Sequence, residues 1–214
     1  MAVLTIRQQL YRTLKQRILD GVYPPGAHLN IDIIAKEQGV SNSPLREAMT
    51  LLVKDRLGEN RPNAGMYVIE ITPQLYRELV DTINIWIEGA YRLCLKYGKT
   101  ECLLALMEER LRALKKVIRR GTDRERIFAI LDFQRCFVTA TENKVFISSF
   151  SSEFDSLCLA YYYNHLGREI DWDINVQRAA TIIDAVRSSL VDTVSDMIWT
   201  WSVPHFEANQ IPEE

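Results

Sequence analysis

The chain has 214 residues, enough for one large domain or two small ones with a substantial core. Its 47% hydrophobic and 25% charged content is that of an ordinary globular protein and argues against a disordered or fibrous chain. With 26 Lys+Arg against 28 Asp+Glu, the net charge of -2 means that any nucleic-acid role must rest on a local site.

The lack of a targeting signal and the spacing of the cysteines predict a cytoplasmic protein. No apolar run approaches the ~18 residues of a membrane span, and the N-terminal stretch becomes charged too soon for a signal peptide. The four cysteines include no C-x-x-C pair, which favours reduced thiols over a disulfide framework or a zinc knuckle. They are Cys94, Cys102, Cys136 and Cys158.

The N-terminal third combines amphipathic helices with turn residues. Ile6, Leu10, Leu14 and Ile18 recur at near-fourfold spacing, which predicts a helix over residues 5–20. A turn at 24–26 precedes a short helix over 31–38 and a second over about 41–55, and two short strands flank a turn at 62–65. Residues 1–70 carry nine Lys+Arg and seven Asp+Glu, so a weak positive excess lies in this third.

From Thr72 onward the pattern is helical almost to the end. The short loops between the apolar stripes predict a compact bundle of six helices. We expect these helices at about 72–98, 100–120, 123–141, 145–162, 174–188 and 190–201.

The stretch IDIIAKEQGVSNSPLREAMTLL has the residue pattern of a helix-turn-helix. Ala35 is the small residue where two helices cross, and Gly39 supplies the turn. Ile34, Val40, Leu45 and Ala48 fill interior positions, and Ser41 is placed to cap the second helix. The remaining side chains point outward at the start of that helix, where a recognition helix meets the major groove: Ser41, Asn42, Ser43, Arg46 and Glu47.

Arg46 has the geometry for a bidentate contact with a guanine edge, and the two serines suit phosphate or base edges. Two short helices joined at a glycine also occur in many proteins that do not bind DNA. The predicted hairpin that follows gives a winged arrangement and favours the DNA interpretation.

These residues resemble the winged helix of the GntR family of bacterial transcription regulators. The resemblance spans residues 5–70 and rests on Pro25-Gly26, VSNSPLREAM and RPNAGMYV. It implies a DNA-binding domain at 1–70 whose contacts include Arg61, Asn63 and Gly65 of the wing. The family usually has Arg in place of Asn42 and often Arg in place of Ala64, so we expect weaker or altered DNA binding.

The helical remainder, 71–214, resembles the FCD-type effector-binding domain of FadR-like members of the family, with Glu88 on its first long helix. Many relatives hold a metal in this domain. The resemblance puts Ile130, Gln134, Ala179 and Trp201 at the ligand positions, and we expect no metal because none of them is a good ligand.

The same resemblance predicts an effector pocket lined by Asn84, Glu88, Gln134 and Trp201. Neutral amides, one carboxylate and an indole suit a neutral or cationic organic ligand better than a small organic acid. The alternative is that these side chains pack a closed core and bind nothing.

Together, the sequence predicts a mainly α protein with an N-terminal winged helix-turn-helix and a C-terminal helical bundle. We expect a homodimeric regulator, by family default a repressor, that binds a double-stranded DNA operator and a small organic effector and needs no cofactor. The competing hypothesis is a protein-interaction module with a purely structural bundle. An enzyme is disfavoured because no catalytic set has usable spacing.

Overall fold

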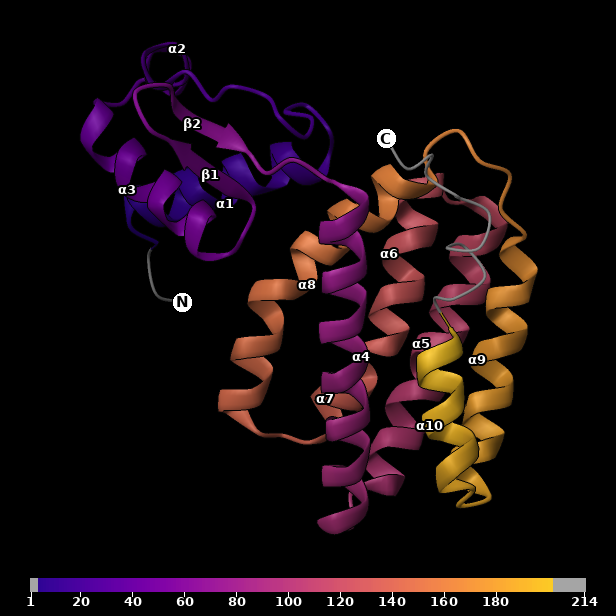
Figure 1. Ribbon diagram of the computed structural model, residues 1–214. Coiled ribbons are helices and arrows are strands. Elements are labelled where there is room, and N and C mark those ends of the chain that lie inside the picture. The colour runs from indigo at the N-terminus through magenta and orange to yellow at the C-terminus, as the bar shows by residue number, and fades with distance from the viewer. Residues whose placement is uncertain (1–3, 202–214) are drawn as a thin grey trace. The chain divides into compact units, whose positions relative to one another are not determined.

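The computed structural model describes residues 4–201 (Figure 1). The chain divides into two compact units, and each is described by itself. The first unit extends to Tyr76 and includes Ser151–Asn164, whereas the second comprises Arg77–Phe150 and the chain from His165 onward.

The first unit begins with three helices, α1 (Ile6–Leu19), α2 (Ile31–Gln38) and α3 (Asn42–Lys54). A capping box between Thr5 and Gln8 starts α1, and the side chain of Asn30 accepts hydrogen bonds from the first backbone amides of α2. These caps satisfy amides that a helix leaves unpaired, and they fix where each helix begins.

The core of this unit lies between α1 and α3, which pack against each other. Leu10, Leu14 and Ile18 are buried on α1, as the fourfold spacing predicts. Ile6, the first residue with this spacing, is 58% exposed. It lies in the first turn of α1, before the stripe that α3 covers.

Two strands, β1 (Gly58–Arg61) and β2 (Gly65–Val68), form an antiparallel hairpin. Gly58 pairs with Val68 and Arg61 with Gly65, so three residues make the connection. Asn63 has φ 60° and Gly65 has φ 91°, both in the left-handed region that Asn and Gly tolerate best. The predicted hairpin is confirmed.

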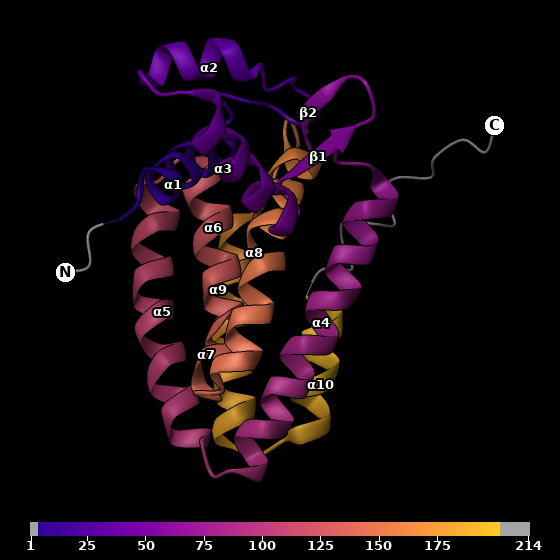
Figure 2. The ribbon, with the colours of Figure 1, turned by 90° about the vertical axis from the view of Figure 1, so that its left-hand side faces the viewer.

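The second unit is helical (Figure 2). Within it α5 packs against α6, α7 and α9, and α10 packs against α9. The helices after the hairpin are α4 (Pro73–Lys96), α5 (Thr100–Arg120), α6 (Asp123–Gln134), α7 (Cys136–Ala140), α8 (Lys144–His165), α9 (Trp172–Arg187) and α10 (Val191–Thr200).

The prediction of one continuous helix over residues 123–141 is wrong. The helix breaks at Arg135 into α6 and α7, which gives seven helices after the hairpin in the described part of the chain instead of six. Arg135 keeps helical dihedrals, φ -59° and ψ -18°, and apolar residues stay buried on both sides of it. The hydrophobic period therefore runs through the break, and the sequence pattern does not reveal it.

The described residues include no helix with both the length and the apolar character to cross a membrane. The chain is thus mainly α, with an N-terminal winged helix-turn-helix and a C-terminal helical part, as predicted.

Candidate nucleic-acid interface

Helices α2 and α3 are joined by a tight turn at Gly39. Gly39 has φ 64°, a left-handed conformation that ends α2 and that L-residues with a side chain adopt only with strain. Ala35 on α2 and Leu45 and Ala48 on α3 are buried, which confirms these predicted interior positions. Val40 is only half-buried, because it lies in the turn itself.

The outer face of α3 presents Arg46 to solvent. The Arg46 guanidinium forms no ion pair with any residue that the structure describes. The Thr50 hydroxyl donates a hydrogen bond to the Arg46 main-chain carbonyl at 3.0 Å, which leaves the guanidinium unengaged. The side chain is thus exposed and its charge is not locally compensated.

The N-terminus of α3 differs from prediction at Ser41. Ser41 is the N-cap residue, with extended φ and ψ, but its hydroxyl makes no capping hydrogen bond. The predicted side-chain cap is wrong, and the first backbone amides of α3 lack a side-chain acceptor. Ser43 beside them is exposed. A helix end of this kind favours an anion such as a phosphate group.

Asn42 does not point freely outward. It is half-buried, and its amide nitrogen donates to the Asp32 carboxylate on α2 at 2.8 Å. This corrects the prediction that Asn42 belongs with the free outward side chains. The hydrogen bond joins α2 to α3 across the turn and fixes the angle between them.

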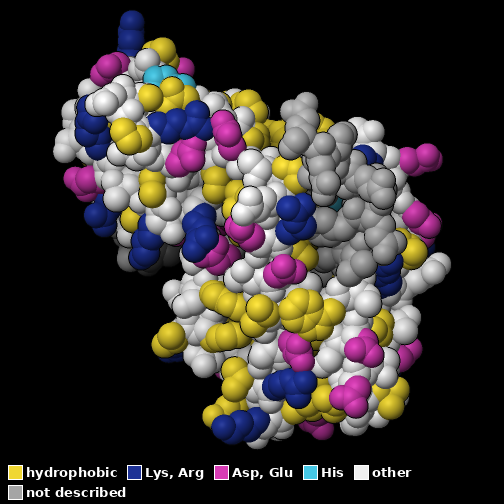
Figure 3. All heavy atoms as spheres, in the orientation of Figure 1, with side chains coloured by type: hydrophobic (Ala, Val, Ile, Leu, Met, Phe, Trp, Pro, Cys, Tyr) yellow, Lys and Arg dark blue, Asp and Glu magenta, His cyan; other side chains and the backbone are white. Residues whose placement is uncertain are grey.

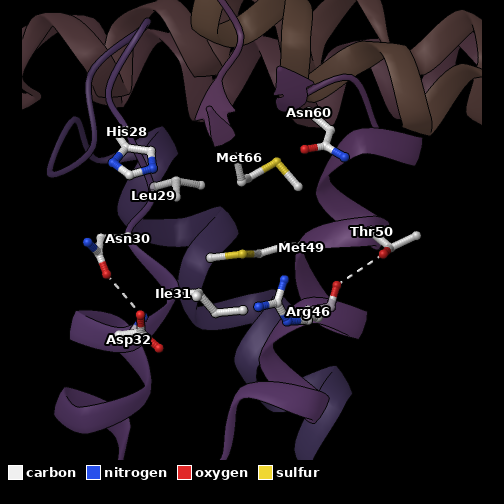
Figure 4. Close-up of a pocket in the computed structure, with 11 residues that line it drawn as sticks. His28, Leu29, Asn30, Ile31, Asp32, Arg46, Met49, Thr50, Asn60 and Met66 are labelled. Carbon is white, nitrogen blue, oxygen red and sulfur yellow. Dashed lines mark hydrogen bonds between the residues drawn. The ribbon is translucent and has the colours of Figure 1, made fainter. Parts of the chain in front are cut away.

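A hollow of about 350 Å³ lies between the start of α2, α3 and the hairpin (Figure 4). In Figure 4 the Arg46 side chain extends across it toward Ile31. Polar residues that the sequence did not indicate also line this hollow: His28, Asn30, Asp32, Thr50 and Asn60. Thr50 follows Arg46 by one helical turn, so i, i+4 spacing would have identified it. Gly65 from the hairpin also lines the hollow.

The wing carries Arg61, which is not free to act as a bare cation. Its guanidinium pairs with the carboxylates of Glu70, at 2.8 Å, and Glu59. Hydrogen bonds to Glu70 and then Glu59 raise the pKa of Arg61, and the group lies 4.3 Å from the centre of the Tyr67 ring. Two carboxylates thus surround the one cation of the hairpin. Asn63 and Gly65 remain exposed at its tip.

Three other cations of this unit, Lys36, Lys54 and Arg56, differ in whether they form an ion pair. Lys36 and Lys54 are exposed, and neither forms an ion pair with a residue in the described range. Arg56 pairs with Glu153 at 3.0 Å. Arg46, Lys36 and Lys54 are therefore the cations of α2 and α3, and none of them is paired within the described chain.

The predicted effector residues are only partly brought together in the second unit. Gln134 and Trp201 line one small cavity, about 10 Å³, whose other walls are apolar. Asn84 is 3% exposed but is not among the residues lining that cavity. A space of this size holds about one water molecule, so an organic ligand would have to open it.

Glu88 faces α10 and not the cavity. Its carboxylate accepts hydrogen bonds from Trp199 Nε1 at 2.7 Å, Arg92 Nη2 at 2.8 Å and Ser195 Oγ at 3.3 Å. These bonds, with that from Trp199 the strongest, lower the pKa of Glu88. The predicted pocket role of Glu88 is therefore not what the structure shows, because this carboxylate joins α4 to α10.

At the metal-ligand positions implied by the resemblance, Ile130 and Ala179 are buried aliphatic side chains with no donor atom. Gln134 and Trp201 offer an amide and an indole. Within residues 4–201, no group of three His, Cys, Asp or Glu side chains is placed to hold a metal ion.

The fold and the exposed face of α3 define the class of protein: one with a winged helix-turn-helix domain followed by a helical region. Residues 6–68 match the family described as "Bacterial regulatory proteins, gntR family". Over residues 6–68 the chain is therefore similar to this family.

Relatives of known sequence support the same assignment. The chain is 35% identical over 116 residues to YdhC of Bacillus subtilis (strain 168), an uncharacterised HTH-type transcriptional regulator, a match that covers 54% of this chain and 51% of YdhC. It is 34% identical over 67 residues to the HTH-type transcriptional repressor RspR of Escherichia coli (strain K12), covering 31% of this chain and 29% of RspR. The chain thus spans about half, or less, of the length of these relatives. Both relatives are named as HTH-type transcription regulators.

Solved structures resemble the whole described chain in fold. Escherichia coli McbR/YncC has a TM-score of 0.74 at 18% identity, covering 96% of this chain and 99% of that one. A putative GntR transcriptional regulator from Rhodococcus sp. RHA1 has a TM-score of 0.69 at 19% identity, covering 91% and 92%. At these identities the likeness shows the fold alone.

Proposed function

We propose that the chain is a bacterial DNA-binding transcription regulator in which α3 enters the major groove and Arg46 contacts a guanine edge. The observation that carries this proposal is the exposed Arg46 guanidinium, without an ion pair in the described chain, one turn from an uncapped helix N-terminus. In winged helix-turn-helix proteins that position faces base edges, and a free guanidinium forms two hydrogen bonds to guanine.

Residues 1–70 form the DNA-binding domain in this proposal. Ser41 and Ser43, with the first amides of α3, bind a backbone phosphate of the operator. Asn63 and Gly65 at the hairpin tip approach the adjacent backbone, where the glycine leaves room. Asn42 acts as a positioning residue through Asp32, since its amide is already engaged.

Residues 71–214 form an FCD-type effector-binding and dimerisation domain in this proposal. A neutral or cationic organic effector enters between Gln134 and Trp201 after α10 moves away from α4. Support comes from the cavity there and from the buried Trp201 Nε1, which has no hydrogen-bond partner among the described residues. Breaking the Glu88–Trp199 hydrogen bond is part of that movement.

Dimerisation and location complete the proposal. Figure 3 shows apolar side chains gathered on the face of the helical unit turned toward the viewer. The exposed apolar side chains of this unit include Ile85 and Tyr97 of α4 and Val145 of α8. A second copy of the chain covers them and places two α3 helices on a near-palindromic operator. The protein acts in the cytoplasm as a repressor, and the effector changes its operator affinity.

Fluorescence anisotropy with DNA from the protein's own promoter region tests the proposal. We expect tighter binding than to random duplex, a linear fall of log affinity with log salt concentration, and a loss of about 1–3 kcal/mol in Arg46→Ala. Arg12→Ala, on α1, is the matched control for loss of one positive charge. Equal affinity for promoter and random duplex would refute operator recognition.

One observation favours the protein-interaction alternative, in which the winged unit binds another protein. Two carboxylates surround Arg61, and the face has few free cations. Under that hypothesis, duplex DNA would not bind at physiological salt, and Arg46→Ala would leave the anisotropy unchanged. The same titration therefore separates the two functions.

A further inference from the structure

Helix α5 carries a row of five basic side chains that the proposed function leaves without a role. They lie at helical positions i, i+3, i+4, i+7 and i+8, so they share one face. All five are exposed, and together they are the residues that line a shallow surface hollow of about 420 Å³. We call this set the basic stripe: Arg112, Lys115, Lys116, Arg119 and Arg120.

The charges of the basic stripe are not paired, since none of its members forms an ion pair with a residue in the described part of the chain. The carboxylates that follow α5 are engaged elsewhere, because Asp123 pairs with Arg126 at 3.1 Å and Glu125 accepts from the amide of Thr122 at 2.7 Å. Five positive charges therefore stand together in a chain whose net charge is -2.

A purely structural role accounts for only part of the stripe. Cations in the last turn of a helix stabilise its C-terminus, which covers Arg119 and Arg120. Arg112 and Lys115 lie too far from that end for this effect, which falls off within one turn. Solubility does not require a single-sign cluster either, since mixed charges serve it.

The opposite face of α5 limits the class of partner. Leu103, Met107, Leu114 and Ile118 are buried in the core of the helical unit. A helix that binds a membrane surface inserts large apolar side chains beside its cations, and no large apolar side chain of α5 is exposed. The stripe therefore suits a partner that offers negative charge alone.

We propose that the basic stripe is a second nucleic-acid surface, which binds the phosphate backbone of duplex DNA outside the operator contacts of α3. From Arg112 to Arg120 the helix rises about 12 Å, so the stripe offers about one cation per 2.4 Å. Duplex DNA carries one negative charge per about 1.7 Å of its axis. The two linear charge densities are similar, and the contact is independent of sequence. The inference extends the proposed function but does not require Arg46 to recognise an operator.

The test is the salt dependence of binding to a random-sequence duplex of about 30 base pairs, measured with the full chain. The stripe variant is Lys115→Gln, Lys116→Gln and Arg119→Gln combined, since Gln matches Lys and Arg in helix propensity. Each lost phosphate contact lowers the slope of log affinity against log salt by about 0.9, so we expect a drop of about 2–3. The same drop is expected in an Arg46→Ala background.

A matched control removes the same charge from scattered positions of the helical unit: Arg77→Gln, Lys144→Gln and Arg168→Gln. We expect its slope to stay within about 0.5 of the wild type. An equal drop in both triple variants would refute the stripe, because net charge alone would then explain the effect. Unchanged random-duplex binding in the stripe variant, with polyglutamate binding reduced, would also overturn the proposal in favour of an acidic protein partner.

A measurement on the unmodified chain guards against misfolding of the variant. Random duplex should protect Lys115 and Lys116 from acetylation, while Lys144 reacts as fast as in free protein. Lys115→Arg with Lys116→Arg keeps both charges and should bind as the wild type does. Unprotected stripe lysines in the DNA complex would refute the inference. If the promoter is not recognised but this protection occurs, the proposed operator function fails and the stripe stands.

Discussion

The sequence suggests Arg61 of the wing as a DNA contact, but its ion pairs lead to a different prediction. Its guanidinium faces the carboxylates of Glu59 and Glu70, the latter at 2.8 Å. A duplex approaching the hairpin therefore meets one positive and two negative charges. We predict that Glu70→Gln strengthens DNA binding, because it removes a charge that repels phosphate and frees Arg61 to contact the backbone.

The magnitude follows from counting charges. Glu70→Gln leaves Arg61 with Glu59 alone, which changes the local sum from -1 to zero and makes Arg61 available as one additional phosphate contact. One added contact steepens the slope of log affinity against log salt by about 0.9. When the salt concentration rises from about 50 to 200 mM, the ratio of the variant's DNA affinity to that of the wild type should thus fall by about 3.5-fold.

The assay is anisotropy of a labelled promoter duplex over that salt range. Glu101→Gln, in the first turn of α5, is the control for removal of one exposed negative charge. Its slope should equal that of the wild type. If Glu70→Gln and Glu101→Gln change affinity equally, the local pairing of Arg61 has no effect on DNA binding and the reasoning is wrong. If Glu70→Gln binds DNA more weakly than the wild type, the ion pair instead holds the wing in the conformation that binds DNA.

Four further predictions concern stability and the thiols. Leu45→Ala removes a fully buried side chain of α3 and should lower the free energy of urea unfolding by about 2–5 kcal/mol, whereas Val53→Ala, 38% exposed on the same helix, should cost below about 1 kcal/mol. Gly39→Ala should lower the free energy of unfolding by about 1–2 kcal/mol, because Gly39 has the left-handed φ of 64° and an added methyl group would contact nothing that offsets the strain. A melting temperature equal to that of the wild type would contradict this. Burial raises the pKa of the Cys136 thiol to about 12, so its alkylation near pH 8 should lag well behind that of the part-exposed Cys102 until urea is added. Because this folded-state pKa lies above the unfolded value, stability present below about pH 9 should fall as the pH rises toward 12, and a flat profile would refute the burial argument.

Local chemistry made much of the fold predictable from the sequence. Fourfold apolar spacing located α1, and Gly39 with its flanking helices located the turn of the helix-turn-helix, since both depend on near neighbours in the chain. Pro62 and Gly65 likewise marked the hairpin. The break at Arg135 was not predictable, because apolar periodicity is the same on both sides of it.

The sequence by itself determined that Arg46 lies on the outer face of α3, because helical spacing and the buried Leu45 leave it no other direction. Only the tertiary structure decided which polar groups are free. Asn42 is bound by Asp32 on another helix, Arg61 by Glu70 beyond the next strand, and Glu88 by Trp199 far along the chain. Such pairings depend on where distant backbone segments meet, and residue type and spacing along one helix carry no information about that.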